Sequence, residues 1–400
     1  MSPIPNPFKP GAGHMPPYLA GRDRETREFD RVLSQSVILE NVILTGLRGL
    51  GKTVLLESFK PMAIARGWLW VGTDLSEAAS LTEERMAMRL IADLAVVTSA
   101  IPYAEEEIIQ MGFGGSSSKV QRTLTFDTLI SVYSQSPGLV ADKLKKLFLT
   151  VWAYVQPHGK KGIIFAYDEA QNLSDSANTN EFPMSLLLDV FQSIQRQSIP
   201  FMLVLTGLPT LLPKLVEART YAERMFHTVF LNKLDEQSSK DAITKPIEDN
   251  SCPINFAPES VESIYRISAG YPYFIQYICR EVFDIWLQAL ESKEPAPPIP
   301  IDGIQRKLDA DFFSGRWARA TDRQRELLKL VVMLPNCEEE FTVQEIAQIS
   351  KEISAKPFSN SHINQMLSTL AGSGLVYKDR RGKYCFAVPL LGQFIKRQTD

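Results

Sequence analysis

The chain has 400 residues, of which 44% are hydrophobic and 22% charged, and its formal net charge at pH 7 is −3. These values are ordinary for a soluble globular protein of two or three domains. No apolar run approaches the ~18 residues of a membrane span. The four cysteines form no CxxC pair, so the sequence shows no zinc signature. We expect a cytoplasmic protein with reduced thiols and no membrane partner.

The first 17 residues are rich in proline and have no apolar core segment. A secretory signal needs such a segment. We therefore expect residues 1–17 to form an extended N-terminal arm.

The stretch Gly46–Thr53 reads GLRGLGKT and fits the GxxxxGK[ST] spacing of a phosphate-binding loop. An apolar run, Asn41–Thr45, predicts a strand before it, and a helix is expected after it. Glycines let backbone N–H groups turn toward an anion, and the helix N-terminus adds partial positive charge. The residues expected to hold the nucleotide are Gly46, Leu47, Arg48, Gly49, Leu50, Gly51, Lys52 and Thr53. The alternative is a glycine-rich turn that binds nothing.

Lys52 supplies a point charge for the β- and γ-phosphates of ATP, and the Thr53 hydroxyl is a ligand for Mg²⁺. The elements expected after the loop are a strand at Gly67–Gly72, a helix at Ser80–Ala95, a flexible patch at Gly112–Ser118 that looks like an insertion, and a helix at Leu139–Val155. Apolar strands are then expected at Ile163–Tyr167 and Pro200–Thr206. Apolar strands that alternate with helices favour an α/β fold with a parallel sheet covered on both faces.

Two carboxylates, Asp168 and Glu169, follow the apolar strand Ile163–Tyr167 directly. An Asp at the end of a buried strand can orient Mg²⁺ and its waters, and the adjacent Glu can polarise the attacking water. Thr206, at the end of the next strand, could bond the γ-phosphate or the water. The alternative for the two acids is an ordinary solvated strand end.

The second half of the chain is helical from Asp235 to Leu290, and the Pro-rich stretch Pro295–Pro300 is a natural boundary. Beyond it, capping boxes at Thr321 and Thr342 mark two helix starts. A third helix is expected at Ser361–Gly372. Two strands, Leu375–Lys378 and Tyr384–Val388, follow it around a Gly-containing turn. Three helices and a hairpin are the order of a winged helix.

Several motifs together resemble those of AAA+ ATPases. They are Gly21–Glu25, the GLRGLGKT loop, Tyr167–Gln171, Thr206–Pro209 and Gly270–Pro272. The chain looks most similar to the STAND ATPases and to archaeal initiator-like ATPases with a C-terminal winged helix. Together with the composition, this resemblance leads us to expect an N-terminal arm (1–17), a P-loop ATPase core (18–234), a helical lid (235–294), a linker with a connecting helix (295–320) and a winged-helix domain (321–400).

The resemblance also implies roles for single residues. Tyr18 and Arg22 would lie near the adenine, and Pro272 would touch the base from the lid. Thr206 would act as a sensor. Arg224, with Arg219 as second choice, stands where related ATPases often place an arginine finger, which implies a homo-oligomer with ATP.

One departure from the family is that the Gly270 turn lacks the arginine that many AAA+ proteins use as a second sensor. Tyr273 and its neighbours stand there instead. We therefore expect slow ATP hydrolysis.

The predicted wing carries the cations Lys378, Arg380, Arg381 and Lys383, which suit phosphate contacts with DNA. The third helix offers Asn364 and Gln365 but no cation. Two functions stay open. The chain is an ATPase that acts on or near DNA, or it is a signalling switch that controls an effector or regulatory protein, with the winged helix as a protein-interaction module. A third interpretation, ATP bound only for stability, is disfavoured by the intact Lys52, Asp168 and Glu169.

Overall fold

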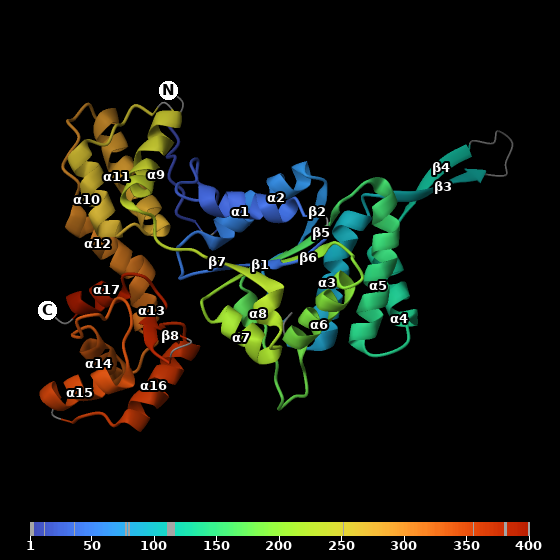
Figure 1. The fold of residues 1–400 in the computed structure, drawn as a ribbon. Helices are drawn as coiled ribbons and strands as arrows, with labels where there is room; N and C mark the ends of the chain where they lie inside the picture. The colour runs from blue at the N-terminus through green and yellow to red at the C-terminus, as the bar shows by residue number, and fades with distance from the viewer. Residues whose placement is uncertain are drawn as a thin grey trace. The chain divides into compact units, whose positions relative to one another are not determined.

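The structure is a computed structural model that describes residues 4–11, 13–35, 37–76, 78, 81–109, 117–250, 252–354, 356–379 and 382–398 (Figure 1). Two compact units make up the chain. The sheet unit comprises residues 24–45 and 55–230. The lid unit comprises residues 1–23, 46–54 and 231–400.

The sheet unit is built on five parallel strands in the order β2-β5-β6-β1-β7. The strands are β1 (Asn41–Thr45), β2 (Trp68–Val71), β5 (Gly162–Tyr167), β6 (Phe201–Gly207) and β7 (Phe226–Phe230). Every residue of β1, β5 and β6 is buried, as expected for apolar strands covered on both faces. The predicted parallel sheet is confirmed.

Helices cover both faces of this sheet (Figure 1). On one face lie α1 (Asp23–Leu33) and α2 (Lys52–Ala65), where Phe29 stacks on Phe59 with ring centroids 4.0 Å apart. The other face is covered by α3 (Glu83–Thr98), α5 (Val140–Val155) and α6 (Pro183–Gln195). There, four phenylalanines form a core cluster with ring centroids between 5.0 and 5.7 Å apart: Phe148, Phe165, Phe191 and Phe201.

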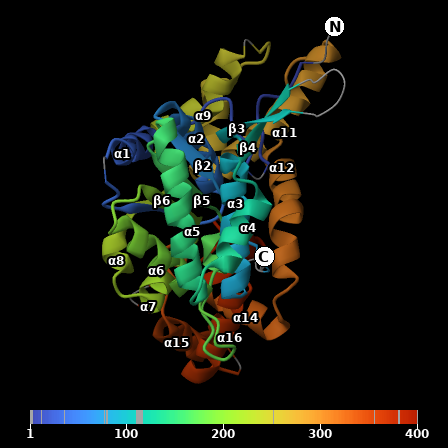
Figure 2. The same ribbon diagram turned by 90° about the vertical axis from the view of Figure 1, so that its right-hand side faces the viewer.

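The remaining helices of the sheet unit are α4 (Phe126–Gln135), α7 (Leu211–Ala218) and α8 (Ala222–Met225). Figure 2 shows α3, α4 and α5 side by side. The helix expected at Ser80–Ala95 begins later, at Glu83, because the Thr82 side chain accepts a hydrogen bond from the Arg85 N–H and caps it. Ser80 lies outside the described residues.

The expected flexible patch at Gly112–Ser118 lies next to a hairpin that the sequence did not predict. Strands β3 (Pro102–Ile109) and β4 (Ser117–Thr123) pair antiparallel. Residues 112–116 of the patch lie outside the described residues, while Ser117 and Ser118 begin β4. A hairpin rather than a plain loop therefore stands in this part of the chain.

The lid unit begins its helical part with α9 (Glu236–Asp249), α10 (Pro258–Ser268) and α11 (Pro272–Glu291). After the Pro-rich stretch come α12 (Ile301–Leu308), a π-helical turn η4 (Asp309–Ser314) and α13 (Gly315–Trp317). The last elements are α14 (Asp322–Val331), α15 (Val343–Ile353), α16 (Asn360–Gly372), β8 (Val376–Lys378), β9 (Tyr384–Phe386) and α17 (Leu391–Arg397).

Both predicted capping boxes are present. The Thr321 and Thr342 side chains accept from the N–H groups of Gln324 and Glu345, whose side chains accept from the cap N–H groups in return. The third helix starts at Asn360, one residue before the expected start, because Ser359 caps it. Helix α17 was not predicted.

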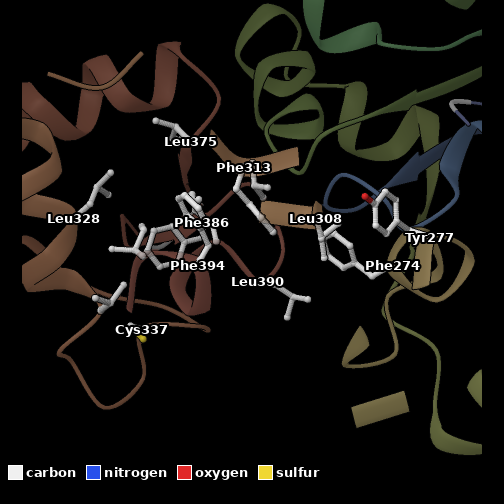
Figure 3. Close-up of a cluster of buried hydrophobic side chains, with 14 of the residues drawn as sticks. Phe274, Tyr277, Leu308, Phe313, Leu328, Cys337, Leu375, Phe386, Leu390 and Phe394 are labelled. Atoms are coloured by element: carbon white, nitrogen blue, oxygen red, sulfur yellow. The ribbon is translucent and has the colours of Figure 1, made fainter. Parts of the chain in front are cut away.

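One hydrophobic core runs through the lid unit from α11 to α17 (Figure 3). Phe313 of η4 lies between its two ends. Its ring is 6.0 Å from that of Phe274 in α11 and 5.2 Å from that of Phe394 in α17. The Pro-rich stretch is bonded to α11, because Trp286 Nε1 donates to the Pro297 carbonyl at 2.8 Å. The lid helices and the winged helix thus share one packed interior.

The N-terminal arm is anchored on α11. Phe8 is 2% exposed and packs against the rings of Phe256 and Phe283 at 6.0 and 6.3 Å. Asn6 Nδ2 donates to the Asp284 carboxylate at 2.7 Å, and the Lys9 N–H donates to Gln276 Oε1 at 3.0 Å. The described helices include none long and apolar enough to cross a membrane.

Candidate nucleotide site

The phosphate-binding loop, Gly46–Thr53, leaves the sheet at the carboxyl end of β1 and enters α2. Its path depends on two glycines in the left-handed region, Gly49 with φ of 76° and Gly51 with φ of 83°. A Cβ on Gly51 would meet no described atom within 4 Å. The loop is therefore open at Gly51, on the side where a phosphate can approach the backbone.

Lys52 lies half-buried at the start of α2. Its Nζ donates to the carbonyls of Gly46 and Leu47, both at 3.0 Å. The loop thus curls around its own ammonium group. No acidic residue stands in the first turn of α2, so the positive end of the helix is not neutralised from within. Glycines in this conformation, a lysine inside the curl and an unneutralised helix start fit the triphosphate of a nucleotide.

Arg22 fixes the loop from the N-terminal side. Arg22 is 5% exposed, and its guanidinium donates to the backbone carbonyls of Leu50, at 3.0 Å, and Asn232, at 2.9 Å. The family resemblance implies that Arg22 lies near the adenine, and the structure shows a hydrogen bond from Arg22 to the loop itself. That Tyr18 and Arg22 line the adenine pocket stays a prediction.

The lid helix α11 also contacts the loop. Pro272 is the first residue of α11, and the N–H of Tyr273 donates to the Gly49 carbonyl at 3.1 Å. A Cβ on Gly49 would stand 3.1 Å from the Tyr273 Cβ. Glycine is therefore favoured at position 49 for two reasons. It adopts the positive φ, and it leaves room for the close approach of α11.

In the sheet unit, Asp168, Glu169 and Thr206 meet at the carboxyl edge of the sheet. Asp168 follows β5, is 4% exposed and accepts hydrogen bonds from the Thr206 hydroxyl and, at 2.7 Å, from the Glu169 N–H. Because β5, β6 and β1 are parallel, this is also the edge from which the chain enters the phosphate loop. We call Asp168, Glu169 and Thr206 the acidic edge.

Beyond its strand, Asp168 is held to the chain that follows β2. Its N–H donates to the Thr73 carbonyl at 3.2 Å, and its own carbonyl accepts from the Leu75 N–H at 2.9 Å. Only glycine fits at position 72, where φ is 128° and a Cβ would stand 1.8 Å from the Ala166 carbonyl oxygen. The main chain at Asp168 is thus held in place by the segment that follows β2.

Glu169 is exposed and has a left-handed backbone with φ of 51°. Its carboxylate accepts a hydrogen bond from the Gln171 amide. The other end of that amide, Gln171 Oε1, accepts from the Leu208 N–H at 3.1 Å, just after β6. Gln171 therefore connects Glu169 to the Thr206 strand. Gln171 belongs to the motif Tyr167–Gln171, but the sequence alone predicted no role for it.

Among the comparisons with known proteins, those with solved structures bear on the fold. A family model described as a domain of unknown function (DUF8462) matches residues 310–395. The chain matches no curated protein. The solved structure of the Walker-type ATPase PABY2304 of Pyrococcus abyssi is similar with a TM-score of 0.58 at 13% identity, over 94% of this chain and 96% of that chain. The ORC2 protein of Aeropyrum pernix in its ADP form is similar with a TM-score of 0.55 at 14% identity, over 98% of this chain and 99% of that chain.

The chain has the fold of the initiator-like AAA+ ATPases. At these identities the likeness concerns the fold alone.

The two arginines expected as finger candidates differ in what they touch. Arg219 Nε and Nη2 bond both oxygens of Asp189 at 2.8 and 2.6 Å, and its Nη1 donates to the Ser185 hydroxyl at 2.8 Å. Arg224 is exposed at the end of α8 and forms no salt bridge with a described residue. Arg224 is therefore the more available cation of the two.

Only part of the wing lies in the described chain. Lys383 Nζ pairs with Glu340 at 2.7 Å, and Lys378 Nζ stands 5.7 Å from the centre of the Tyr384 ring. Arg380 and Arg381 lie outside the described residues. The exposed face of α16 carries Asn364 and Gln365 and no Lys or Arg. Base reading by this helix would thus depend on uncharged side chains.

Proposed function

We propose that the protein binds ATP with Mg²⁺ and hydrolyses it slowly to ADP and phosphate. The observation that carries the proposal is the acidic edge, where Asp168 is buried and held by Thr206 at the same edge of the sheet from which the phosphate loop begins. A strand end with solvated acids would not bury one carboxylate and tie it to the neighbouring strand.

Each residue has a task in this proposal. Backbone N–H groups of Gly46–Thr53 bind the phosphates, and Lys52 exchanges its loop carbonyls for phosphate oxygens. Thr53 and Asp168 would hold Mg²⁺, which when bound neutralises charge on the β- and γ-phosphates. Glu169 accepts the proton of the attacking water. Turnover is slow because Glu169 is bonded to Gln171 and because Tyr273 brings no positive charge to the first turn of the lid.

The test separates binding from hydrolysis. Lys52→Ala should abolish ATP binding, while Lys60→Ala, an exposed lysine of the same helix, should bind as the parent does. Glu169→Gln should keep binding and lower turnover by about 10²- to 10⁴-fold, the range for losing a general base. Binding is measured with a fluorescent nucleotide and turnover by phosphate release. Parental turnover in Glu169→Gln would show that Glu169 is not the base.

The proposal extends to assembly, with Arg224 acting on the nucleotide of a neighbouring copy. It is supported by the exposure of Arg224 and by the engagement of Arg219 with Asp189. Loss of a finger in trans costs ~10³-fold or more in turnover. Arg224→Ala mixed with Lys52→Ala should regain activity, since each supplies what the other lacks. A monomer at all ATP concentrations, with no rescue, would remove the finger.

For the winged helix we propose a contact with DNA through the cations of the wing. The expected affinity falls with salt, and changing positions 380 and 381 to Ala should flatten the log–log slope by about two units. The second candidate is an ATP-dependent switch that controls an effector or regulatory protein. It is favoured by the uncharged face of α16 and the pairing of Lys383 with Glu340. A parent that binds no duplex at low salt would decide for this second function.

A further inference from the structure

Arg316 stands on an aromatic cluster at the first turn of the lid helix. It belongs to α13, between the lid and the winged helix, and is half-buried. Its guanidinium lies 4.4 Å from the centre of the Phe312 ring and donates to the Phe312 carbonyl. The Phe312 ring is in turn 5.0 Å from that of Tyr273. These contacts fix the guanidinium group against the start of α11.

The same turn of α11 is bonded to the phosphate loop, because the Tyr273 N–H donates to the Gly49 carbonyl at 3.1 Å. Arg48 is the neighbour of Gly49 in the loop, and its side chain is exposed. Its Nη2 lies 3.8 Å from the point where a Cβ of Gly374 would stand, in the turn between α16 and β8. Arg48 thus extends from the loop toward the turn between α16 and β8.

Arg316 lies within electrostatic range of two other arginines. Burial and the positive charges of Arg48 and Arg319 lower the pKa of Arg316, and the only opposing influence is the Tyr273 phenol. Within the described part of the chain, neither Arg48 nor Arg316 forms a salt bridge. Asp311, the acid nearest in sequence, is bonded to the Tyr277 hydroxyl at 2.8 Å. A half-buried guanidinium beside a like charge is unfavourable unless an anion joins them.

We propose that Arg48 and Arg316 together bind a phosphate group, and that this phosphate belongs to the nucleotide held in the loop. The inference rests on the proposed function. It gives the site the cation that the Gly270–Tyr273 turn lacks, but from the segment that leads into the winged helix. Nucleotide binding would then replace repulsion between Arg48 and Arg316 by attraction, and so connect the loop to the winged helix.

The first experiment compares Arg316→Gln with Arg319→Gln, an exposed arginine of the same segment. We expect Arg316→Gln to weaken ATP binding by about ten- to a hundredfold, the range for losing charge-assisted hydrogen bonds. Arg319→Gln should change it by less than about threefold. Arg316→Lys, which restores the charge, should recover part of the loss. Equal ATP affinity in the parent and Arg316→Gln, with both proteins folded by circular dichroism, would overturn the inference.

The second experiment reverses a sign. Without nucleotide, Arg48→Gln should leave the melting temperature unchanged or raise it, because a repulsion is removed. With saturating ATP, the same variant should melt below the parent. A merely structural role would lower the melting temperature in both conditions and would contradict the inference.

Inorganic phosphate separates the two sources of the anion. If millimolar phosphate raises the melting temperature of the parent but not of Arg316→Gln, while both bind ATP equally, the pair holds free phosphate and the nucleotide assignment is wrong. A parent that binds no ATP at all would overturn the proposed function and this inference with it. If the parent binds ATP and Arg316→Gln binds it with the same affinity, this inference alone is wrong.

Discussion

The phosphate loop and the acidic edge are held in place by different kinds of bond. In the lid unit, Arg22 and Tyr273 reach the loop through its backbone carbonyls, at Leu50 and Gly49. In the sheet unit, side chains hold side chains, with Thr206 on Asp168 and Gln171 on Glu169. The loop is thus fixed by the shape of its surroundings, whereas the acidic edge depends on the identity of single residues.

This difference predicts how each region fails. Damage to the lid interior should displace the whole loop and weaken nucleotide binding. Damage at the acidic edge should leave binding intact and change the rate.

The largest expected effect is that of Phe313→Ala in the core of the lid unit. Phe313 is fully buried between Phe274 and Phe394, and its truncation should cost about 3–5 kcal/mol of unfolding free energy. Phe191→Ala, equally buried in the sheet unit, should cost as much. Only Phe313→Ala should also weaken ATP binding, because Phe274 and Phe312 support the turn at Tyr273. Denaturant unfolding and nucleotide titration check both, and equal ATP affinity in the two variants would break the comparison.

A smaller effect is expected at Gly72, which brings the chain after β2 to Asp168. Gly72→Ala combines a φ of 128° with a Cβ only 1.8 Å from the Ala166 carbonyl oxygen, and should cost more than about 2 kcal/mol. Gly159→Ala is its control, since φ there is 68° and a Cβ would have no described atom within 4 Å. That control should cost about 1 kcal/mol. Thermal unfolding of both variants would show whether steric overlap or backbone conformation determines the loss of stability. Equal losses would mean that the chain around Gly72 moves to accommodate the added Cβ.

Gln171→Ala tests the acidic edge, the region that is held by side-chain hydrogen bonds. Removing the amide frees the Glu169 carboxylate from a hydrogen bond worth about 1 kcal/mol, so turnover should rise by up to about tenfold. ATP affinity should stay within about twofold of the parent. Gln197→Ala, an exposed glutamine after α6, serves as control. A fall in turnover would mean that Gln171 orients Glu169 rather than restrains it.

The smallest effect concerns pH. Burial raises the pKa of Asp189, but hydrogen bonds from Arg219 and Tyr221 outweigh it and leave that pKa below its ordinary value of 3.8. The pair therefore stabilises the fold above that value and loses its effect as pH falls through the lower folded pKa. Because both side chains are about one-third exposed, the contribution is small. The melting temperature of Arg219→Gln should depend less on pH between about 5 and 3 than that of the parent. Identical pH profiles would indicate that the pair adds no stability.

Residues close together in the sequence could be assigned to the site from the sequence, and residues brought in from afar could not. The phosphate loop is one contiguous motif, and Asp168 follows an apolar strand, so spacing alone indicated both. Gln171 bonds Leu208 and Arg22 bonds Asn232, contacts that no local pattern predicts. Arg316 lies more than 250 residues from Arg48, in a short helix without a motif. Helix α17 is seven residues long, too short for periodicity to be recognised.

The π-helical turn η4 makes this part of the chain sensitive to changes of length. Such a turn holds one more residue than an α-helical turn, and it sits between Leu308 and Gly315. Deleting one residue from it would convert the turn to α-helical geometry and change which of its side chains face the core. Phe313 would leave the core and Arg316 would leave the Phe312 ring. In a library of single-residue deletions, positions 309–314 should thus be among the least tolerant, and less tolerant than positions 295 and 296, which precede the bonded Pro297.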